Sequence, residues 1–327
     1  MDSHTIPSAV LTAFNVSPDA RIETISGGKV NATWLVESNE GKYILQSISA
    51  VFSEDMITES TKILDELIVT GWDVPKILRT HDNLPFYSDE GLTWRLSMFI
   101  DSDEALPELS PQLLTECGTL LASLHRSLNN IHISINPTLP HYREHTYHLE
   151  HLAERVDSLA DDASSLAATT LEAFRSLDLA HEDSPKQLIH ADPKINNILF
   201  RDKKPYTYID WDTIMVHSPY IDIGDFLRSL TKEMKGSALH DLVVAFCQGY
   251  YDSTDLTCGN FEEFYNNAIT SAQTIALENT ARYLSDIVDQ SHWKWDENKY
   301  DSHEDAMVDQ ATKTWNVYTE LAALHSR

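Results

Sequence analysis

The sequence is poor in cysteine, in long apolar runs and in basic residues at its start. Its cysteines, Cys117, Cys247 and Cys258, are widely spaced and form no CxxC pair, which argues against a disulfide framework and against a zinc site. No run approaches a membrane span, and the first residues lack the features of a signal peptide. With 327 residues, 42% of them apolar, the chain is expected to be a soluble cytoplasmic protein with room for two lobes.

Positive charge is also scarce. The chain has 24 Lys and Arg against 51 Asp and Glu, which gives a formal charge of −27. Nucleic acids and anionic membranes are bound by clustered Lys and Arg, so both are excluded as expected partners. The acidic surface would attract a cationic small molecule, or would serve only to keep the protein solvated.

The most informative stretch runs from residue 188 to residue 212. Apolar runs at 188–190, 198–200 and 206–209 read as strands, with a turn at 202–205. Between and after them stand polar side chains in the order and spacing of a kinase-type phosphoryl-transfer site: His190, Asp192, Lys194, Asn197 and Asp210. Asp-Pro is also a common turn and Asn-Asn can cap a bend. The second Asp after an apolar strand favours the catalytic interpretation.

Phosphoryl transfer from a nucleotide requires a base near the acceptor hydroxyl, a cation near the moving phosphate and oxygen ligands for Mg²⁺. Asp192 would orient or deprotonate the hydroxyl, and Lys194 would contact the γ-phosphate of ATP. Asn197 and Asp210 would ligate Mg²⁺, which the strongly negative chain needs in order to hold a nucleotide. His190 would brace the loop. Asp212 reads equally well as a solvated or hydrogen-bonded loop residue and as a second metal ligand.

The first hundred residues predict a small antiparallel sheet with one helix. Strands are expected at 21–25, 32–36, 42–48 and 93–100, and a helix at 53–69 with Ser53 as its N-cap. Gly27 and Gly28 form a hairpin turn or a loop whose backbone approaches phosphate oxygens. The last strand would end at a hinge, where Met98, Phe99 and Ile100 would line an adenine pocket or offer backbone hydrogen bonds to the adenine. An ordinary buried strand explains the same residues.

Helical periodicity follows from Ser110-Pro111 onward. Helices are expected from there, over 148–178 as one long stretch, and over 235–252, 259–291 and 303–325. The predicted fold class is therefore α+β, with a small N-terminal nucleotide-binding lobe at 1–101. A larger, mainly helical lobe at 102–327 would carry the catalytic and acceptor-binding site.

The chain resembles the aminoglycoside phosphotransferase/choline kinase superfamily of small-molecule kinases, and within it the N-acetylhexosamine 1-kinase-like branch. The matching segments are residues 28–36, 43–46, 94–100, 190–199, 209–215, 222–228 and 281–286. The resemblance implies a protein-kinase-like bilobal fold, and it implies that the protein uses ATP and Mg²⁺.

By position, the resemblance implies that Asp192 is the catalytic base and that Asn197 and Asp210 are the metal ligands. The loop that contains Gly27, Gly28 and Lys29 would cover the nucleotide phosphates, and Asp222 or Asp225 would tie the catalytic loop to the helix beneath it. Three residues would face the acceptor: Arg228, Arg282 and Asp286. An Arg and an Asp four positions apart on a helix also form an ordinary ion pair.

One position departs from the common pattern. Most kinases of this fold carry a Lys on the third strand, and Gln46 stands there. The hexosamine-kinase-like branch resembles this chain in having a Gln, so Lys29, Lys42 or the metal would have to supply the charge. Glu59 and Glu66 are candidates for the helix carboxylate that would pair with such a Lys.

Three functions stay open on the sequence. The first is a Mg²⁺·ATP-dependent kinase for a hydroxyl, including the anomeric one, of a hexose or N-acetylhexosamine. The second is a kinase for an aminoglycoside, choline or homoserine-type acceptor. The third is a non-catalytic nucleotide-binding homologue, although retention of the whole polar set argues against decay. Aromatic residues suited to a sugar or to a cation occur late in the chain: Trp293, Trp295, Tyr300 and Trp315.

Overall fold

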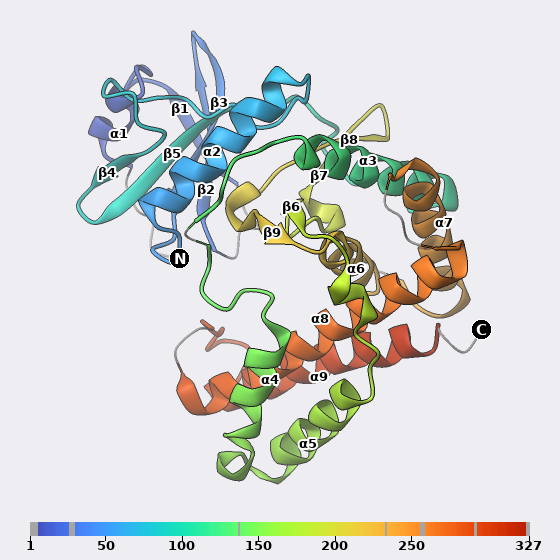
Figure 1. The fold of residues 1–327 in the computed structure, drawn as a ribbon. Helices are drawn as coiled ribbons and strands as arrows, with labels where there is room; N and C mark the ends of the chain where they lie inside the picture. The colour runs from blue at the N-terminus through green and yellow to red at the C-terminus, as the bar shows by residue number, and fades with distance from the viewer. Residues whose placement is uncertain are drawn as a thin grey trace.

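The computed structural model describes residues 6–25, 30–136, 138–232, 234–255, 259–290 and 293–324 (Figure 1). A small lobe built on one sheet lies at one end, and a larger helical lobe lies at the other. The predicted α+β architecture is thus confirmed. The glycine loop predicted at Gly27, Gly28 and Lys29 falls outside the described residues.

The sheet of the small lobe has five antiparallel strands in the order β1-β2-β3-β5-β4. Their bounds are β1 Arg21–Ile25, β2 Ala32–Ser38, β3 Gly41–Ile48, β4 Tyr87–Asp89 and β5 Leu92–Met98. Alternate residues of β2 and β3 are buried, as the two-residue period of a strand requires. The sequence did not predict β4, which has three residues and is too short for that period to be read.

Two helices accompany the sheet, α1 at Ser8–Ala13 and α2 at Glu54–Val69. The predicted N-cap of α2 is confirmed, because Ser53 accepts a hydrogen bond from the backbone N–H of Met56 at 3.3 Å. The six-residue helix α1 was not predicted, since it spans less than two turns of the helical period.

The large lobe is mainly helical. Its helices are α3 Pro111–Asn129, α4 His145–Ala153, α5 Asp161–Arg175, α6 Pro219–Leu230, α7 Gly236–Ser253, α8 Phe261–Asp289 and α9 His303–Ala322. The expected helix over 148–178 was wrong as a single element. The chain turns at a 3-10 segment, Val156–Ser158, so that α4 and α5 pack separately against α8. Tertiary packing here overrides a local pattern that allowed one helix.

Helix α6 was not among the helices predicted from periodicity. Its polar residues Asp222, Asp225 and Arg228 recur every three positions between apolar ones, a helical period that the prediction did not use, and all 12 of its residues are buried. It lies against α8 and beneath the loop that follows β6 Gln187–Ile189. This helix supports the loop that carries the candidate site.

The helices of the large lobe pack with little spare space. Where α3 meets α7, a Cβ added to Gly118 would lie 2.1 Å from the carbonyl oxygen of Phe246, and one added to Gly249 would lie 2.1 Å from that of Thr115. Only glycine permits the two backbones to approach this closely. The described part of the chain contains no helix long and apolar enough to cross a membrane.

A hairpin of the large lobe is hydrogen-bonded to the segment that links the two lobes. It consists of β7 Ile198–Arg201 and β8 Lys204–Tyr208, joined by a turn at Asp202 and Lys203 with φ of 52° and 62°. The backbone N–H of Asp103 donates to the carbonyl of Phe200 at 2.7 Å, and the N–H of Lys203 donates to Asp103 Oδ2 at 2.7 Å. The chain that links the lobes is therefore bonded directly to this hairpin.

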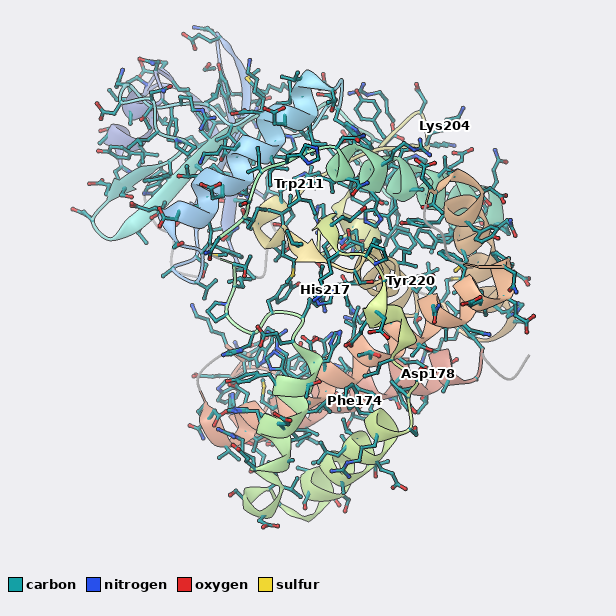
Figure 2. All side chains as sticks on the ribbon, viewed as in Figure 1. Phe174, Asp178, Lys204, Trp211, His217 and Tyr220 are labelled. Atoms are coloured by element: carbon teal, nitrogen blue, oxygen red, sulfur yellow. The ribbon has the colours of Figure 1, made fainter. Side chains whose placement is uncertain are left out.

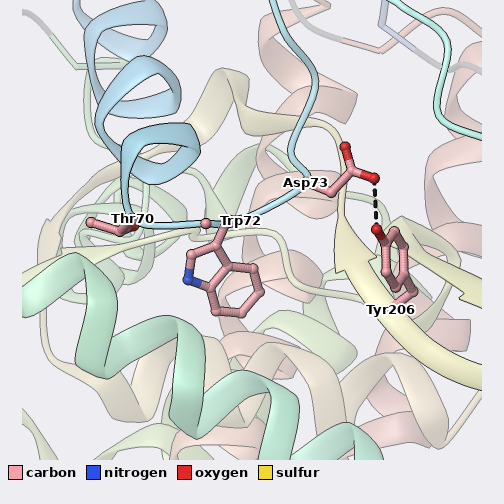
Figure 3. A pocket seen from close by; sticks show the side chains of 5 residues that line it. Thr70, Trp72, Asp73 and Tyr206 are labelled. Carbon is pink, nitrogen blue, oxygen red and sulfur yellow. Dashed lines mark hydrogen bonds between the residues drawn. The ribbon is translucent and has the colours of Figure 1, made fainter.

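A pocket lies beside the same hairpin, at the end of α2. It is lined by Thr70, Gly71, Trp72, Asp73 and Tyr206 (Figure 3). The Tyr206 hydroxyl donates to Asp73 at 2.7 Å, and the Trp72 indole donates to Ser127 of α3 at 2.9 Å. The sequence singled out none of these residues for chemistry, and their contacts join the small lobe to the large one.

Trp211 lies where the lobes meet, close to α2 (Figure 2). Its indole donates to the carbonyl of Tyr208 at 3.0 Å, and its ring lies 4.6 Å from that of His190. The 3-10 turn Trp211–Thr213 leads into β9 Met215–His217, which pairs with β6. The segment after β8 is thereby packed against the loop after β6.

The free energy of unfolding is expected to depend on pH because of His217, at the end of β9. Burial lowers its pKa to about 4, whereas an unfolded histidine titrates near 6.5. Between these values the unfolded state binds the extra proton, so stability is expected to fall as the pH drops from about 6.5 to 4, by at most about 3 kcal/mol. Urea unfolding at several pH values would show the slope.

His217→Asn should flatten that slope, whereas His132→Asn, at an exposed histidine, should leave it as in the parent. Equal slopes in the parent and in His217→Asn would assign the acid sensitivity to other groups.

Candidate active site

The loop after β6 is fixed to α6 by one buried carboxylate. Asp222 accepts hydrogen bonds from the backbone N–H groups of His190 at 2.9 Å and of Ala191 at 2.7 Å. His125 Nε2 also lies 2.9 Å from Asp222 Oδ2. Ala191 has a left-handed φ of 66°, a conformation that a non-glycine residue adopts only when its surroundings enforce it. Asp222 therefore ties the loop to the helix beneath it, as expected.

His190 lies buried under this loop. Its Nδ1 accepts the backbone N–H of Asp192 at 3.3 Å, and its Nε2 lies 3.0 Å from the carbonyl oxygen of Ile209. This network assigns the neutral tautomer with the proton on Nε2. The imidazole thus connects the backbone of Asp192 to the residue before Asp210, which is a bracing role.

The Asp192 carboxylate is the point where the loop's polar side chains meet. Lys194 Nζ lies 2.5 Å from its Oδ2, and Asn197 Nδ2 lies 3.1 Å from the same oxygen. Asn197 Nδ2 also donates to the backbone carbonyl of Asp192 at 2.8 Å. Burial acts to lower the pKa of Lys194, but the Asp192 carboxylate outweighs it and the pKa is raised. Lys194 is therefore held as a cation beside the carboxylate.

Asp210 completes this group from the segment after β8. Its backbone is left-handed at φ 70°, and its Oδ2 lies 4.0 Å from Lys194 Nζ. Burial of the site raises the pKa of Asp210, and so do the neighbouring carboxylates of Asp212 and Asp192. The side chain itself is 42% exposed. An accessible carboxylate crowded by two others is a suitable ligand for a cation.

The donor set fits Mg²⁺ shared with a nucleotide. Both side-chain hydrogen bonds of Asn197 are made through Nδ2, so the side-chain oxygen is the atom that can ligate. No three His, Cys, Asp or Glu side chains gather as a metal cluster in the parts of the chain that the structure describes. Mg²⁺ commonly takes one or two protein ligands and completes its shell with water and phosphate oxygens. The pair Asn197 and Asp210 suits that arrangement.

Asp212 is a buried, hydrogen-bonded residue, one of the two predicted alternatives. Arg95 of β5 contacts both of its oxygens, at 2.5 Å and 3.2 Å, and Asn31 Nδ2 donates to it at 2.7 Å. The same guanidinium donates to Gln46 Oε1 at 2.7 Å. Arg95 was not predicted as a site residue, although a single charge between Trp94 and Leu96 in an apolar strand was a visible signal.

Several groups predicted to contact the nucleotide already have partners within the protein. At the end of β5, the N–H of Met98 donates to Lys76 O at 2.9 Å and that of Phe99 to Lys42 O at 3.0 Å, so neither N–H is available to an adenine. Met98 is exposed, and Phe99 and Ile100 are partly buried. The predicted substitute Lys42 is exposed and pairs with Glu37 at 2.9 Å.

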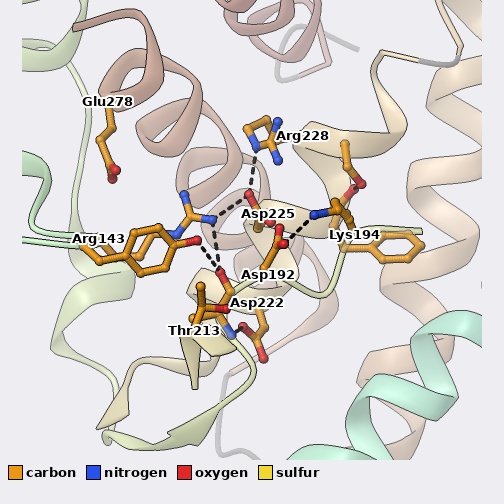
Figure 4. A network of polar contacts seen from close by, with 12 residues as sticks. Arg143, Asp192, Lys194, Thr213, Asp222, Asp225, Arg228 and Glu278 are labelled. Carbon is orange, nitrogen blue, oxygen red and sulfur yellow. Dashed lines mark hydrogen bonds and ion pairs between the residues drawn. The ribbon is translucent and has the colours of Figure 1, made fainter. Parts of the chain in front are cut away.

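On the far side of the loop lies a buried ionic network. Asp225 Oδ1 lies 2.9 Å from Arg143 and 2.8 Å from Arg228 (Figure 4). Burial acts to raise the pKa of Asp225, but the two guanidinium groups outweigh it and hold that pKa well below its usual range. Arg143 also donates to the carbonyl of Ala191 at 3.1 Å. It thereby joins the network to the catalytic loop.

A second set of charges continues along α8. Glu278 lies 2.5 Å from His145 Nδ1 and 3.6 Å from Arg282. Burial acts to raise the pKa of Glu278, but the His145 hydrogen bond and the neighbouring cations lower it to about 2. Arg282 also lies over the ring of Trp293, 5.4 Å from its centroid.

The three residues expected at the acceptor therefore all have partners in the protein. Arg228 pairs with Asp225, and Arg282 pairs with Glu278 one turn earlier on α8. Asp286 contacts His303 at 3.1 Å and accepts the backbone N–H of Trp293 at 3.2 Å. Arg143 and Glu278 were not predicted, because they are far apart in the chain and belong to no motif.

Residues 21–256 match the model of the phosphotransferase enzyme family. That segment contains the sheet, the lobe crossing and every residue placed at the catalytic loop, while α8 and α9 lie beyond it.

Several solved structures share the fold. An amicoumacin kinase in complex with AMP-PNP, Ca²⁺ and Ami is 15% identical, with 92% of this chain and 89% of that one covered and a TM-score of 0.66. A microcompartment-associated aminopropanol kinase is 17% identical, with 98% of both chains covered and a TM-score of 0.65. An aminoglycoside phosphotransferase from Alicyclobacillus acidocaldarius is 16% identical, with 100% and 97% covered and a TM-score of 0.59. At these identities the likeness concerns the fold.

Proposed function

The chain belongs to the phosphotransferase enzyme family, whose model spans most of it, and from this premise we propose that it is a Mg²⁺-dependent kinase that transfers the γ-phosphoryl group of ATP to a hydroxyl of a small molecule. The convergence of Lys194 and Asn197 on Asp192 Oδ2, with Asp210 4.0 Å from the Lys194 ammonium, carries the proposal. One base, one cation and one pair of oxygen ligands are thereby brought together, as phosphoryl transfer requires.

Each residue has a distinct part in the reaction. Asp192 accepts the proton of the acceptor hydroxyl while the hydroxyl oxygen forms a bond to the γ-phosphorus of ATP. The bond between that phosphorus and the oxygen of the leaving ADP breaks. Lys194 stabilises the negative charge of the moving phosphoryl group. Asn197 and Asp210 would hold Mg²⁺, which would offset the charge of the phosphates when bound. His190 and Asp222 fix the loop backbone and so keep the Asp192 carboxylate in place.

We infer that the acceptor is an uncharged polyol, a hexose or N-acetylhexosamine. A cationic acceptor requires carboxylates that are free to pair with it, but the carboxylates behind the loop already face arginine or histidine: Asp225, Glu278 and Asp286. The rings of Tyr283 and Trp293, with centroids 4.9 Å apart, suit a sugar ring. The formal charge of −27 favours the alternative, an aminoglycoside, choline or homoserine-type acceptor.

A panel assay tests the acceptor. Purified protein would be mixed with Mg²⁺·ATP and with hexoses, N-acetylhexosamines, amino alcohols or aminoglycosides, and ADP release recorded. We expect the highest kcat/KM with an N-acetylhexosamine, and loss of the sugar's reducing end if the anomeric hydroxyl is the acceptor. A higher kcat/KM with an amino alcohol or an aminoglycoside would replace the polyol with a cationic acceptor while leaving the kinase assignment in place.

The metal assignment predicts a steep dependence of nucleotide affinity on the divalent ion. In excess EDTA, ATP is expected to bind at least about tenfold more weakly than in Mg²⁺, because its phosphates then face Asp210 and the anionic chain uncompensated. Calorimetric titration under both conditions measures this. Asp210→Asn should reduce the difference, whereas Asp241→Asn, at a 73% exposed carboxylate, should not. Equal ATP affinity with and without metal would contradict the assignment.

A further inference from the structure

A buried arginine joins the sheet of the small lobe to the segment that carries the proposed metal ligand. Arg95 on β5 is 5% exposed, and its guanidinium contacts both oxygens of Asp212 and the side-chain oxygen of Gln46. Asp212 follows Asp210 by two residues. The contact therefore links the strand next to β3 with the loop at which Mg²⁺ is proposed to bind.

The strand register places this arginine beside the position of the missing lysine. Arg95 is directly opposite Gln46 in the pairing of β3 with β5, so the two side chains project from the same face of the sheet. The neighbouring residues Trp94 and Leu96 are buried on the other face. A guanidinium from β5 thus reaches the place where a third-strand ammonium would lie.

The guanidinium keeps unused hydrogen-bonding capacity. An arginine has five N–H donors, and Arg95 makes three hydrogen bonds, all through its terminal nitrogens. Its Nε is buried and has no hydrogen-bond partner. A buried donor that is left unpaired destabilises the folded protein. Such a donor is a feature expected of a site that awaits an anionic ligand.

The same cluster reaches the segment that leads out of the glycine loop. Asn31 donates to Asp212 at 2.7 Å and accepts the backbone N–H of Ser49 at 2.9 Å. Three segments therefore meet at one carboxylate: the start of β2, the middle of β5 and the turn after Asp210. The loop expected to cover the nucleotide phosphates comes just before Asn31 in the chain, and the proposed metal ligand Asp210 comes two residues before Asp212.

We propose that Arg95 is the phosphate-binding cation of the nucleotide site. From β5, the strand next to β3, it performs the role that a lysine on the third strand has in most kinases of this fold. Gln46 and Asp212 orient its guanidinium. A guanidinium also suits a phosphate better than an ammonium does, because it can donate two parallel hydrogen bonds. The inference rests on the proposed function, since it assigns a residue to the nucleotide site of that kinase.

The first test compares a nucleotide with a nucleoside. In Arg95→Gln, Mg²⁺·ATP and Mg²⁺·ADP should bind at least about tenfold more weakly, or about 1.4 kcal/mol, while adenosine binds as in the parent protein. Calorimetry measures all three affinities. An equal loss for adenosine would mean that Arg95 has only a structural part, and unchanged ATP affinity would overturn the proposal.

The second test covers a variant that fails to fold because Asp212 is left buried without its partner. Arg95→Gln combined with Asp212→Asn removes both charges of the pair. If this pair of changes restores stability but leaves Mg²⁺·ATP binding weak and adenosine binding normal, the phosphate role stands. If it restores nucleotide affinity as well, Arg95 serves only to neutralise Asp212 and the proposal is wrong.

A charge exchange gives the sharpest result. Gln46→Lys alone should weaken Mg²⁺·ATP binding, because it sets an ammonium against the Arg95 guanidinium. With Arg95→Gln, the same lysine should recover most of the lost affinity, since the cation has moved one strand across. Lys62→Gln is the control, because it removes a 51% exposed cation from α2 of the same lobe and should leave ATP affinity unchanged. No recovery in the double variant would count against the proposal.

Failure of this proposal is distinguishable from failure of the kinase assignment. If the parent protein binds Mg²⁺·ATP and releases ADP while Arg95→Gln matches it, only the role of Arg95 is lost. If the parent protein neither binds Mg²⁺·ATP nor turns it over, the proposed function fails, and the assignment of Arg95 fails with it.

Discussion

The Asp192→Asn protein is expected to fold and to bind Mg²⁺·ATP, but to turn over about 10²–10⁴-fold more slowly, the usual range for the loss of a positioned acid–base group. The amide keeps an oxygen that can still accept from Lys194 and Asn197, so the loop geometry should survive. It cannot take up the proton of the acceptor hydroxyl. Single-turnover kinetics with the acceptor identified in the panel would measure the change.

The informative comparison is with Asp241→Asn, which removes a 73% exposed carboxylate and lowers the total negative charge by the same amount. That control should turn over at the parent rate. If Asp192→Asn also retains near-parent turnover with an unchanged unfolding transition, Asp192 is not the base.

Asp225→Asn is expected to cost about 3–5 kcal/mol of stability, because removal of one member of a buried ion pair leaves its partners uncompensated. Both Arg143 and Arg228 would lose their carboxylate in a fully buried site. Since the folded state lowers the pKa of Asp225, this stabilisation is fully present above the usual carboxyl pKa and is lost progressively as the pH falls from there through the lowered pKa of the folded protein. Urea unfolding at neutral pH gives the free energy.

Asp309→Asn is the matched control for this change. It breaks the exposed i,i+4 pair with Lys313 on α9, and exposed pairs of that kind contribute at most about 1 kcal/mol. A loss in Asp225→Asn no larger than in Asp309→Asn would show that water enters the network and solvates the two guanidinium groups.

The catalytic loop could be predicted from sequence because its geometry is local. Asp192, Lys194 and Asn197 lie within six positions, and two short strands bound the loop, so spacing along the chain nearly fixes spacing in the structure. The bracing of the loop by His190 and its attachment to α6 by Asp222 also follow from this short segment and the helix after it.

The rest of the site depends on contacts between distant parts of the chain. Arg95 and Asp212 are 117 positions apart, and His145 and Glu278 are 133 apart. No local pattern indicates which buried charge will face which. Helix α6 was not predicted either, although Asp222, Asp225 and Arg228 recur at a helical spacing in its sequence. Only the assembled fold shows these partners.

The turn of the β7–β8 hairpin restricts how this chain can change in length. Surface turns usually tolerate inserted residues, but Asp202 and Lys203 both have positive φ, as a two-residue hairpin turn requires. The N–H of Lys203 is bonded to Asp103 in the crossing between the lobes. A single inserted residue would shift that N–H away from its acceptor, so insertions here should be selected against while neighbouring loops vary freely.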